Sequence, residues 1–112
     1  GLSTRLYLRL GVTPLDTICY LIYPASIPWR AHSDTALTLI DSTGIEIAAQ
    51  NIQIPCGGSR LICISELFNA DLRARAGVSG YIQVRDLGCR LFGYHGLTNG
   101  QGAFSLDHMF GF

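Results

Sequence analysis

The chain has 112 residues, of which 48% are hydrophobic and 14% charged, and its formal net charge is zero. This length suits one domain with one core, and the neutrality argues against non-specific nucleic-acid binding, which needs a positive surface. We therefore expect a single domain over residues 1–112. Because an average soluble protein has about 25% charged residues, the low charged fraction of this chain also predicts that part of its surface is apolar.

No segment of the sequence has the composition of a membrane-spanning helix. The longest uncharged apolar stretch, residues 17–29, contains Pro24 and Pro28. It is also shorter than the roughly 20 apolar residues that a bilayer requires. We therefore expect a chain that does not span a membrane.

The first half of the chain predicts strands. Residues 5–10 alternate between polar and apolar side chains, which indicates a strand with one buried face. Residues 17–23 are apolar on both faces and rich in β-branched and aromatic types, which is typical of a central strand. The stretch 24–34, with its prolines, predicts a long loop.

A hairpin follows this loop. Residues 36–41 and 45–54 predict two strands around the turn 41–44, in which Gly44 suits a left-handed position. In the return strand the apolar positions change from odd to even, and a bulge near Gln50 would restore the inward face.

The second half adds a strand at 60–65 and then the only helical pattern, near 66–76. Asn69 is placed to cap this helix and Gly77 to end it, and the helix would cross from one sheet to the other. Strands over 81–86, 89–95 and 103–109 complete the pattern.

Asn99-Gly100 is a strong hairpin signal. If these two residues occupy the centre of the turn, Thr98 faces Gln101, and His95 and His108 lie on the same face of the sheet about 13 Å apart. That separation is too large for one metal ion.

Seven or eight short strands and one short helix predict an all-β, two-sheet antiparallel sandwich of immunoglobulin-like or jelly-roll type. We find no complete catalytic, nucleotide or metal motif, and none of the four cysteines lies in a C-x-x-C pair. Cys19, Cys63 and Cys89 read as buried residues of strands, whereas Cys56 in its Gly-rich loop reads as an exposed thiol. A disulfide framework remains the alternative.

The run 80–85 (Gly-Tyr-Ile-Gln-Val-Arg), followed by 91–94 (Leu-Phe-Gly-Tyr), resembles the last strands of bacterial extracytoplasmic immunoglobulin-like modules. The resemblance covers about 15 residues and transfers no functional residue. It implies a binding or scaffolding module, often an accessory piece of something larger, and favours an extracytoplasmic location.

We therefore expect a non-enzymatic interaction module or accessory subunit, without a cofactor, that binds a protein partner or itself through an apolar face. One alternative is a module that binds a glycan or another small ligand through aromatic side chains. Another is a metal-dependent enzyme that uses His32 with His95 or His108. The candidate contact residues are Trp29, Arg30, His32, Tyr94, His95, Phe110 and Phe112.

Overall fold

A computed structural model describes residues 4–10, 15–24, 30–99 and 104–108, the last of these as a strand backbone only. The described residues form eight strands and two short helices. In chain order these are β1 (Thr4–Arg9), β2 (Asp16–Ile22), β3 (Thr35–Ile40), β4 (Glu46–Ile52), β5 (Ser59–Cys63), α1 (Ile64–Leu67), α2 (Ala70–Ala76), β6 (Tyr81–Asp86), β7 (Phe92–Thr98) and β8 (Phe104–His108).

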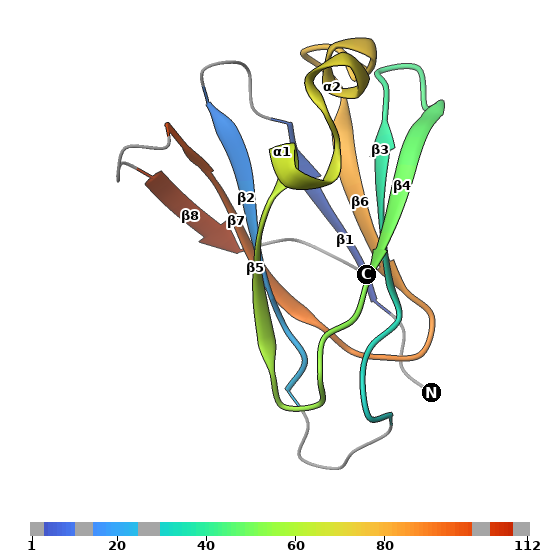
Figure 1. The fold of residues 1–112 in the computed structure, drawn as a ribbon, viewed down its shortest axis with the longest axis vertical. Helices are drawn as coiled ribbons and strands as arrows, with labels where there is room; N and C mark the ends of the chain where they lie inside the picture. Colours follow the sequence, from blue (N-terminus) through green and yellow to red (C-terminus); the bar gives the residue numbers. More distant parts are fainter. Residues whose placement is uncertain (1–3, 11–14, 25–29, 100–103, 109–112) are drawn as a thin grey trace.

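The strands form two antiparallel four-stranded sheets that pack face to face (Figure 1). Sheet A has the strand order β1-β6-β3-β4, and sheet B has the order β5-β2-β7-β8. The predicted all-β, two-sheet antiparallel sandwich is confirmed. The prediction that residues 17–23 form a central strand also holds, because β2 lies between β5 and β7.

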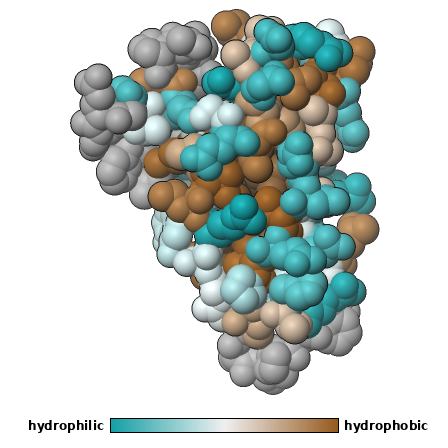
Figure 2. All heavy atoms as spheres, in the orientation of Figure 1, coloured by the Kyte–Doolittle hydropathy of each residue, from teal (hydrophilic) through white to brown (hydrophobic). Residues whose placement is uncertain are grey.

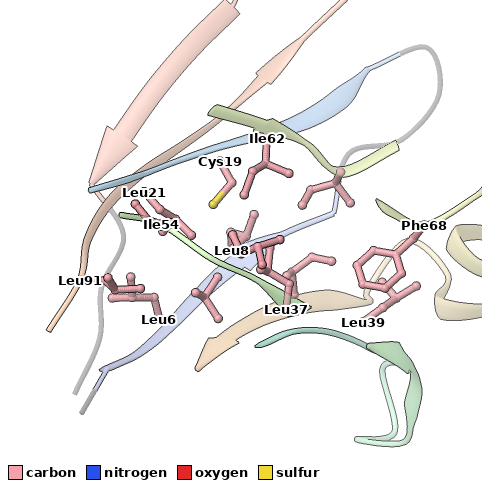
Figure 3. Packing of buried hydrophobic residues seen from close by; sticks show 14 of the residues in the cluster. Leu6, Leu8, Cys19, Leu21, Leu37, Leu39, Ile54, Ile62, Phe68 and Leu91 are labelled. Atoms are coloured by element: carbon pink, nitrogen blue, oxygen red, sulfur yellow. The ribbon is translucent and has the colours of Figure 1, made fainter. Parts of the chain in front are cut away.

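The core lies between the sheets and is made of alternate strand positions. On β1, Leu6 and Leu8 are buried whereas Arg5 and Arg9 are exposed, which is the alternation expected of a strand with one buried face. Figure 3 shows leucine and isoleucine side chains from both sheets meeting in this layer, with Cys19 of β2 among them.

The β3–β4 hairpin turns at Asp41 as predicted. The Asp41 Oδ1 accepts hydrogen bonds from the backbone N–H groups of Thr43 and Ile45, at 2.8 and 3.0 Å, and Gly44 takes a φ of 87°. The bulge, however, was predicted near Gln50, and the register instead shifts opposite Leu39 and Ile40, close to the turn. The turn itself therefore absorbs the extra residue.

The single helix predicted near 66–76 is two helices separated at Phe68. Phe68 has an extended backbone and a fully buried side chain, which interrupts the helix so that its ring can enter the core. The predicted cap is confirmed, because Asn69 Oδ1 accepts a hydrogen bond from the Leu72 N–H at 2.9 Å. Gly77 follows α2 with a φ of 79°. The two helices carry the chain from sheet B to sheet A across one end of the sandwich (Figure 1).

Strand β7 begins three residues later than the predicted start at Cys89. The backbone N–H groups of Gly88 and Cys89 both donate to Asp86 Oδ1 at 2.8 Å. Since these amides are used in a turn around the carboxylate, they cannot begin a strand ladder, and pairing starts only at Phe92.

The predicted register of the last hairpin is wrong. Thr98 pairs with Phe104 rather than with Gln101, a displacement of three residues, because the connection spans residues 99–103 instead of a two-residue turn. An odd displacement moves side chains to the opposite face of a sheet. His95 therefore pairs with Asp107, and the position of His108 pairs with Tyr94, so the two histidine positions lie on opposite faces.

Candidate interaction surface

The outer face of sheet B is a grid of apolar and aromatic side chains, which follows from the strand register. Residues paired across antiparallel strands point to the same side of the sheet. Since Cys19 and Leu21 face the core, the alternate residues of β2 face outward. The outward rows on β5, β2 and β7 are Ser59–Ile22–Phe92, Leu61–Tyr20–Tyr94 and Cys63–Ile18–Gly96. We call these nine residues the sheet B face.

Two large side chains of the sheet B face are open to solvent. Leu61, at the end of the middle row, is 61% exposed, and Phe92, at a corner of the grid, is 55% exposed. Leu61 and Phe92 flank the Tyr20–Tyr94 pair, and the phenol of Tyr20 donates to Ser59 Oγ at 3.0 Å. Burying apolar area lowers the free energy by roughly 25 cal/mol per Å². Contact between this face and another apolar surface is therefore favourable.

The outer face of sheet A is chemically different. Its strands present arginines at Arg5, Arg9 and Arg85, together with Gln83 and Thr38. The sheet B face contains no charged residue, and Arg60 on β5 does not belong to it because it pairs with the core-facing Leu21. Hydrophobic atoms in Figure 2 gather along the seam between the sheets, with hydrophilic atoms over the flank where β4 lies. The contrast between the two outer faces singles out sheet B.

The contact residues predicted from the sequence do not converge on one site. Tyr94 is on the sheet B face, whereas its neighbour His95 points to the opposite side, beside Cys19. Arg30 and His32 are exposed at the end of the sandwich that follows β2. Trp29, Phe110 and Phe112 lie outside the described residues. The sequence analysis missed Leu61 and Phe92, whose solvent exposure depends on the register of β5 and β7.

Arg30 is fixed by the buried ring of Tyr23. The Tyr23 hydroxyl donates to the Arg30 carbonyl and accepts from the Arg30 N–H, both at 3.2 Å. The neighbouring Cys89 thiol raises the pKa of Tyr23 first, and burial raises it further. The Arg30 guanidinium lies directly on Gly88, where a Cβ atom would come within 2.7 Å of Arg30 Cζ. These contacts anchor the loop structurally.

Asp86 is buried, and the described donors around it satisfy its carboxylate. Its Oδ2 accepts from the Thr35 hydroxyl at 2.9 Å and the Asp34 N–H at 3.1 Å, while Oδ1 accepts the two amides of the turn that follows β6. Ser33 Oγ lies 2.8 Å from Thr35 Oγ1 and accepts from the Ile54 N–H at 3.0 Å. With four donors, the Asp86 carboxylate joins the end of β6 to the start of β3, and no lone pair is left for a substrate. Ser33 extends this network to Ile54.

The remaining ionisable groups are dispersed. His32 Nδ1 lies 3.1 Å from the Ser33 carbonyl on the surface. Among the described residues, no three histidine, cysteine, aspartate or glutamate side chains come together as a metal site. Neither described helix has the length and hydropathy to cross a bilayer.

The cysteines fall into two classes. Cys19 and Cys89 are buried, and burial raises the pKa of Cys19 to about 12. Cys56 and Cys63 are half-buried, and desolvation, followed by the charges of Glu66 and Asp16, raises the pKa of Cys63. Cys63 is on the sheet B face and not in the core, which corrects its predicted burial. Cys56 is the partly accessible thiol that its loop predicted.

Compared with known protein families, with characterised proteins and with solved structures, the chain matches none.

Proposed function

We propose that the protein is a non-enzymatic β-sandwich interaction module that self-associates through the sheet B face. The observation that carries the proposal is the row Leu61–Tyr20–Tyr94, which is apolar and aromatic on the outward side of a sheet. Leu61 in this row is 61% exposed, and Phe92 in the adjoining row is 55% exposed. A contiguous apolar patch of this kind usually marks a contact with another molecule.

A second copy of this chain is the occupant that the charges favour. The chain has no net charge, so two copies do not repel each other at long range. The sheet B face is itself uncharged, and it therefore offers an ionic partner nothing to pair with. Two such faces related by a two-fold axis bury tyrosine and leucine against tyrosine and leucine, as two sheets do inside a sandwich.

The area of the sheet B face limits the affinity of the proposed dimer. The nine residues lie on three strands about 4.8 Å apart and span five residues of each, at about 3.3 Å per residue, which gives a flat area of about 240 Å². Two copies therefore cover about 480 Å² before side-chain relief is counted, which is well below the about 1,600 Å² of a standard interface. We expect a weak, reversible dimer.

The proposed absence of catalysis rests on the arrangement of the reactive groups. His32 and His95 belong to different parts of the sandwich, and the Asp86 carboxylate is used structurally. A nucleophile, a base and an orienting group must lie within hydrogen-bond reach of one another. The described side chains offer no such set.

A second candidate, glycan binding, is favoured by the Tyr20–Tyr94 pair, because neighbouring aromatic rings can stack on a sugar. A sugar also needs hydrogen-bonding groups around the rings. The flanking residues Leu61, Ile22 and Phe92 are apolar, which favours a protein surface instead. Unchanged tyrosine and tryptophan fluorescence across a glycan panel would exclude this candidate.

The kinship with bacterial extracytoplasmic immunoglobulin-like modules stays a part of this proposal. It is supported by the all-β sandwich and by the positions of Tyr81 and Tyr94, which lie in β6 and β7, the strands carrying the resemblance. Such modules bind or support a larger assembly, and this role agrees with a weak self-association surface.

Sedimentation velocity over a wide range of protein concentration tests the proposal. We expect the sedimentation coefficient of the wild type to rise with concentration, and the Leu61→Glu variant to remain at the monomer value. Val78→Glu is the matched control, because Val78 is 78% exposed in the turn after α2 and away from the sheet B face. A wild type that stays monomeric throughout, or a control that loses association equally, would contradict a second copy as the occupant.

A further inference from the structure

We propose that the outer face of sheet A binds a neutral oligosaccharide, with a pyranose ring stacked on Tyr7 and Tyr81 and its hydroxyl groups hydrogen-bonded to the polar side chains around them. This site lies on the opposite sheet from the sheet B face, so it does not depend on the proposed self-association.

The first observation is a pair of tyrosine rings in contact on the outer side of sheet A. Tyr7 on β1 and Tyr81 on β6 belong to adjacent strands (Figure 1), and their ring centroids lie 6.0 Å apart with the ring planes inclined by 54°. Both side chains are partly exposed. Aromatic rings can stack on the apolar faces of sugars. Because these two rings hold each other in place, a ligand does not have to order them.

The second observation is that polar groups surround the two rings. Gln83 lies directly opposite Tyr7, and its Nε2 donates to the Tyr7 hydroxyl oxygen at 3.3 Å, so the phenol proton remains for a ligand. Arg9 lies directly opposite Tyr81, and its side chain is exposed. A sugar that covers the rings therefore meets donors on both strands.

The third observation is the order of charges across this part of the face. The row that contains Tyr81 runs from Arg9 on β1 through Tyr81 and Ile40 to the exposed Glu46 on β4. An arginine only donates hydrogen bonds and a carboxylate only accepts them, whereas a sugar hydroxyl does both. A neutral sugar can therefore use both ends of this row, and the Glu46 carboxylate repels an acidic one.

The other charged groups of this face lie farther from Tyr81. Arg5 and Arg85 form the next row beyond Tyr7 and Gln83, and the exposed Asp34 precedes β3 beyond that row. The site therefore depends on the two tyrosines, Gln83 and the row of Tyr81, and not on these three groups.

The surroundings of the tyrosine pairs separate the two outer faces. Around Tyr20 and Tyr94 on sheet B the flanking side chains are apolar, whereas Tyr7 and Tyr81 have an amide and a guanidinium directly opposite them. A sugar needs such polar groups beside the rings. An open sheet face also leaves both ends of a sugar chain free, so we expect an oligosaccharide to bind and not only a single sugar.

Titration calorimetry with two neutral glucose oligomers, cellohexaose and maltohexaose, tests the site. We expect saturable binding of at least one oligomer, and the linkage that binds identifies the shape of the ligand. Binding should weaken about tenfold or more in Tyr7→Ala/Tyr81→Ala, because both stacking rings are lost. The matched control is Tyr20→Ala/Tyr94→Ala, which removes two tyrosines from sheet B and should bind within about twofold of the wild type. Circular dichroism checks that both variants are folded.

Two further arms separate stacking from hydrogen bonding and from charge. Tyr7→Phe/Tyr81→Phe keeps both rings and should therefore retain more affinity than the alanine double variant. Tetragalacturonate, an acidic sugar chain, should bind more weakly than the neutral oligomer because of Glu46. No saturable binding of either glucose oligomer, equal losses in the two alanine double variants, or tetragalacturonate binding at least as tightly, would overturn the proposal.

Discussion

Tyr20 on β2 lies directly opposite Tyr94 on β7, and both face away from the core of the sandwich. A paired position between central strands is normally among the most protected in a sheet. Here the pair is flanked by Leu61 on the edge strand β5, so the apolar surface continues to the border of the sheet. The protein thus has an inner core between the two sheets and a second apolar surface on the outside of sheet B. This outer surface is the one that we propose for association.

The buried carboxylate of Asp86 makes a prediction about stability. Asp86→Ala leaves the Thr35 hydroxyl and three backbone N–H groups without their acceptor. Each buried donor without a partner costs about 1–3 kcal/mol, so we expect the free energy of unfolding to fall by about 3–5 kcal/mol. Urea denaturation measures this loss. Leu87→Ala, a neighbouring exposed position, should change it by less than about 0.5 kcal/mol; equal losses would show that the network is not the cause.

Asp41 makes a prediction about acid stability. Hydrogen bonds from the Thr43 hydroxyl and then from the Ile45 N–H hold the pKa of Asp41 below its ordinary value of 3.8. A carboxyl whose pKa is lower in the folded state stabilises the fold above the unfolded pKa, and this contribution disappears as the pH falls through the folded pKa. Asp41→Asn should therefore flatten the stability curve below about pH 4.

Denaturation at a series of pH values compares Asp41→Asn with Glu66→Gln, an exposed position on α1. The Glu66 variant should follow the wild-type curve. If the Asp41 variant follows it as well, the turn does not depend on the ionised carboxylate.

The four thiols should react at different rates. At pH 8 we expect iodoacetamide to label Cys56 and Cys63 in the folded protein, and to label Cys19 and Cys89 only after unfolding. The reason is that Cys19 and Cys89 are buried and the pKa of Cys19 is raised to about 12, so that almost no Cys19 thiolate forms. Peptide mass spectrometry locates the label. Cys19 labelled as fast as Cys63 in the folded state would contradict the packing of β2.

The cap of α2 is expected to make a smaller contribution to stability than the Asp86 carboxylate. Asn69→Ala removes the side chain that accepts the Leu72 N–H, and should lower the free energy of unfolding by about 1 kcal/mol. The matched control is Gln53→Ala, an exposed residue outside the helix. An unchanged midpoint of thermal unfolding in the Asn69 variant would show that the cap is dispensable.

Local signals in the sequence predicted much of the fold. The alternation in 5–10, the turn at Asp41 and the helix boundaries at Asn69 and Gly77 each depend on chemistry within a few residues, and each appears in the structure. The interruption at Phe68 could not be predicted in this way. It results from the fit of one ring into a core formed by distant strands.

The sequence was less informative about pairing between strands. The hairpin after β7 was assigned a two-residue turn on the strength of Asn99-Gly100, and the register proved to be displaced by three residues. The sheet B face depends on such registers, because a residue such as Leu61 reads as core until its partner Tyr20 is known to face outward. Tyr94 was predicted as a contact residue and is on this face, whereas His95 is not.

A dilution series of amide NMR spectra tests self-association through the sheet B face most directly. We expect the amide shifts of β5, β2 and β7 to move together with concentration, to fit one monomer–dimer equilibrium, and to stay constant in the Leu61→Glu variant. We expect the amide shifts of β1 and β6 on sheet A to stay constant. Spectra that are independent of concentration, or shifts confined to sheet A, would contradict it.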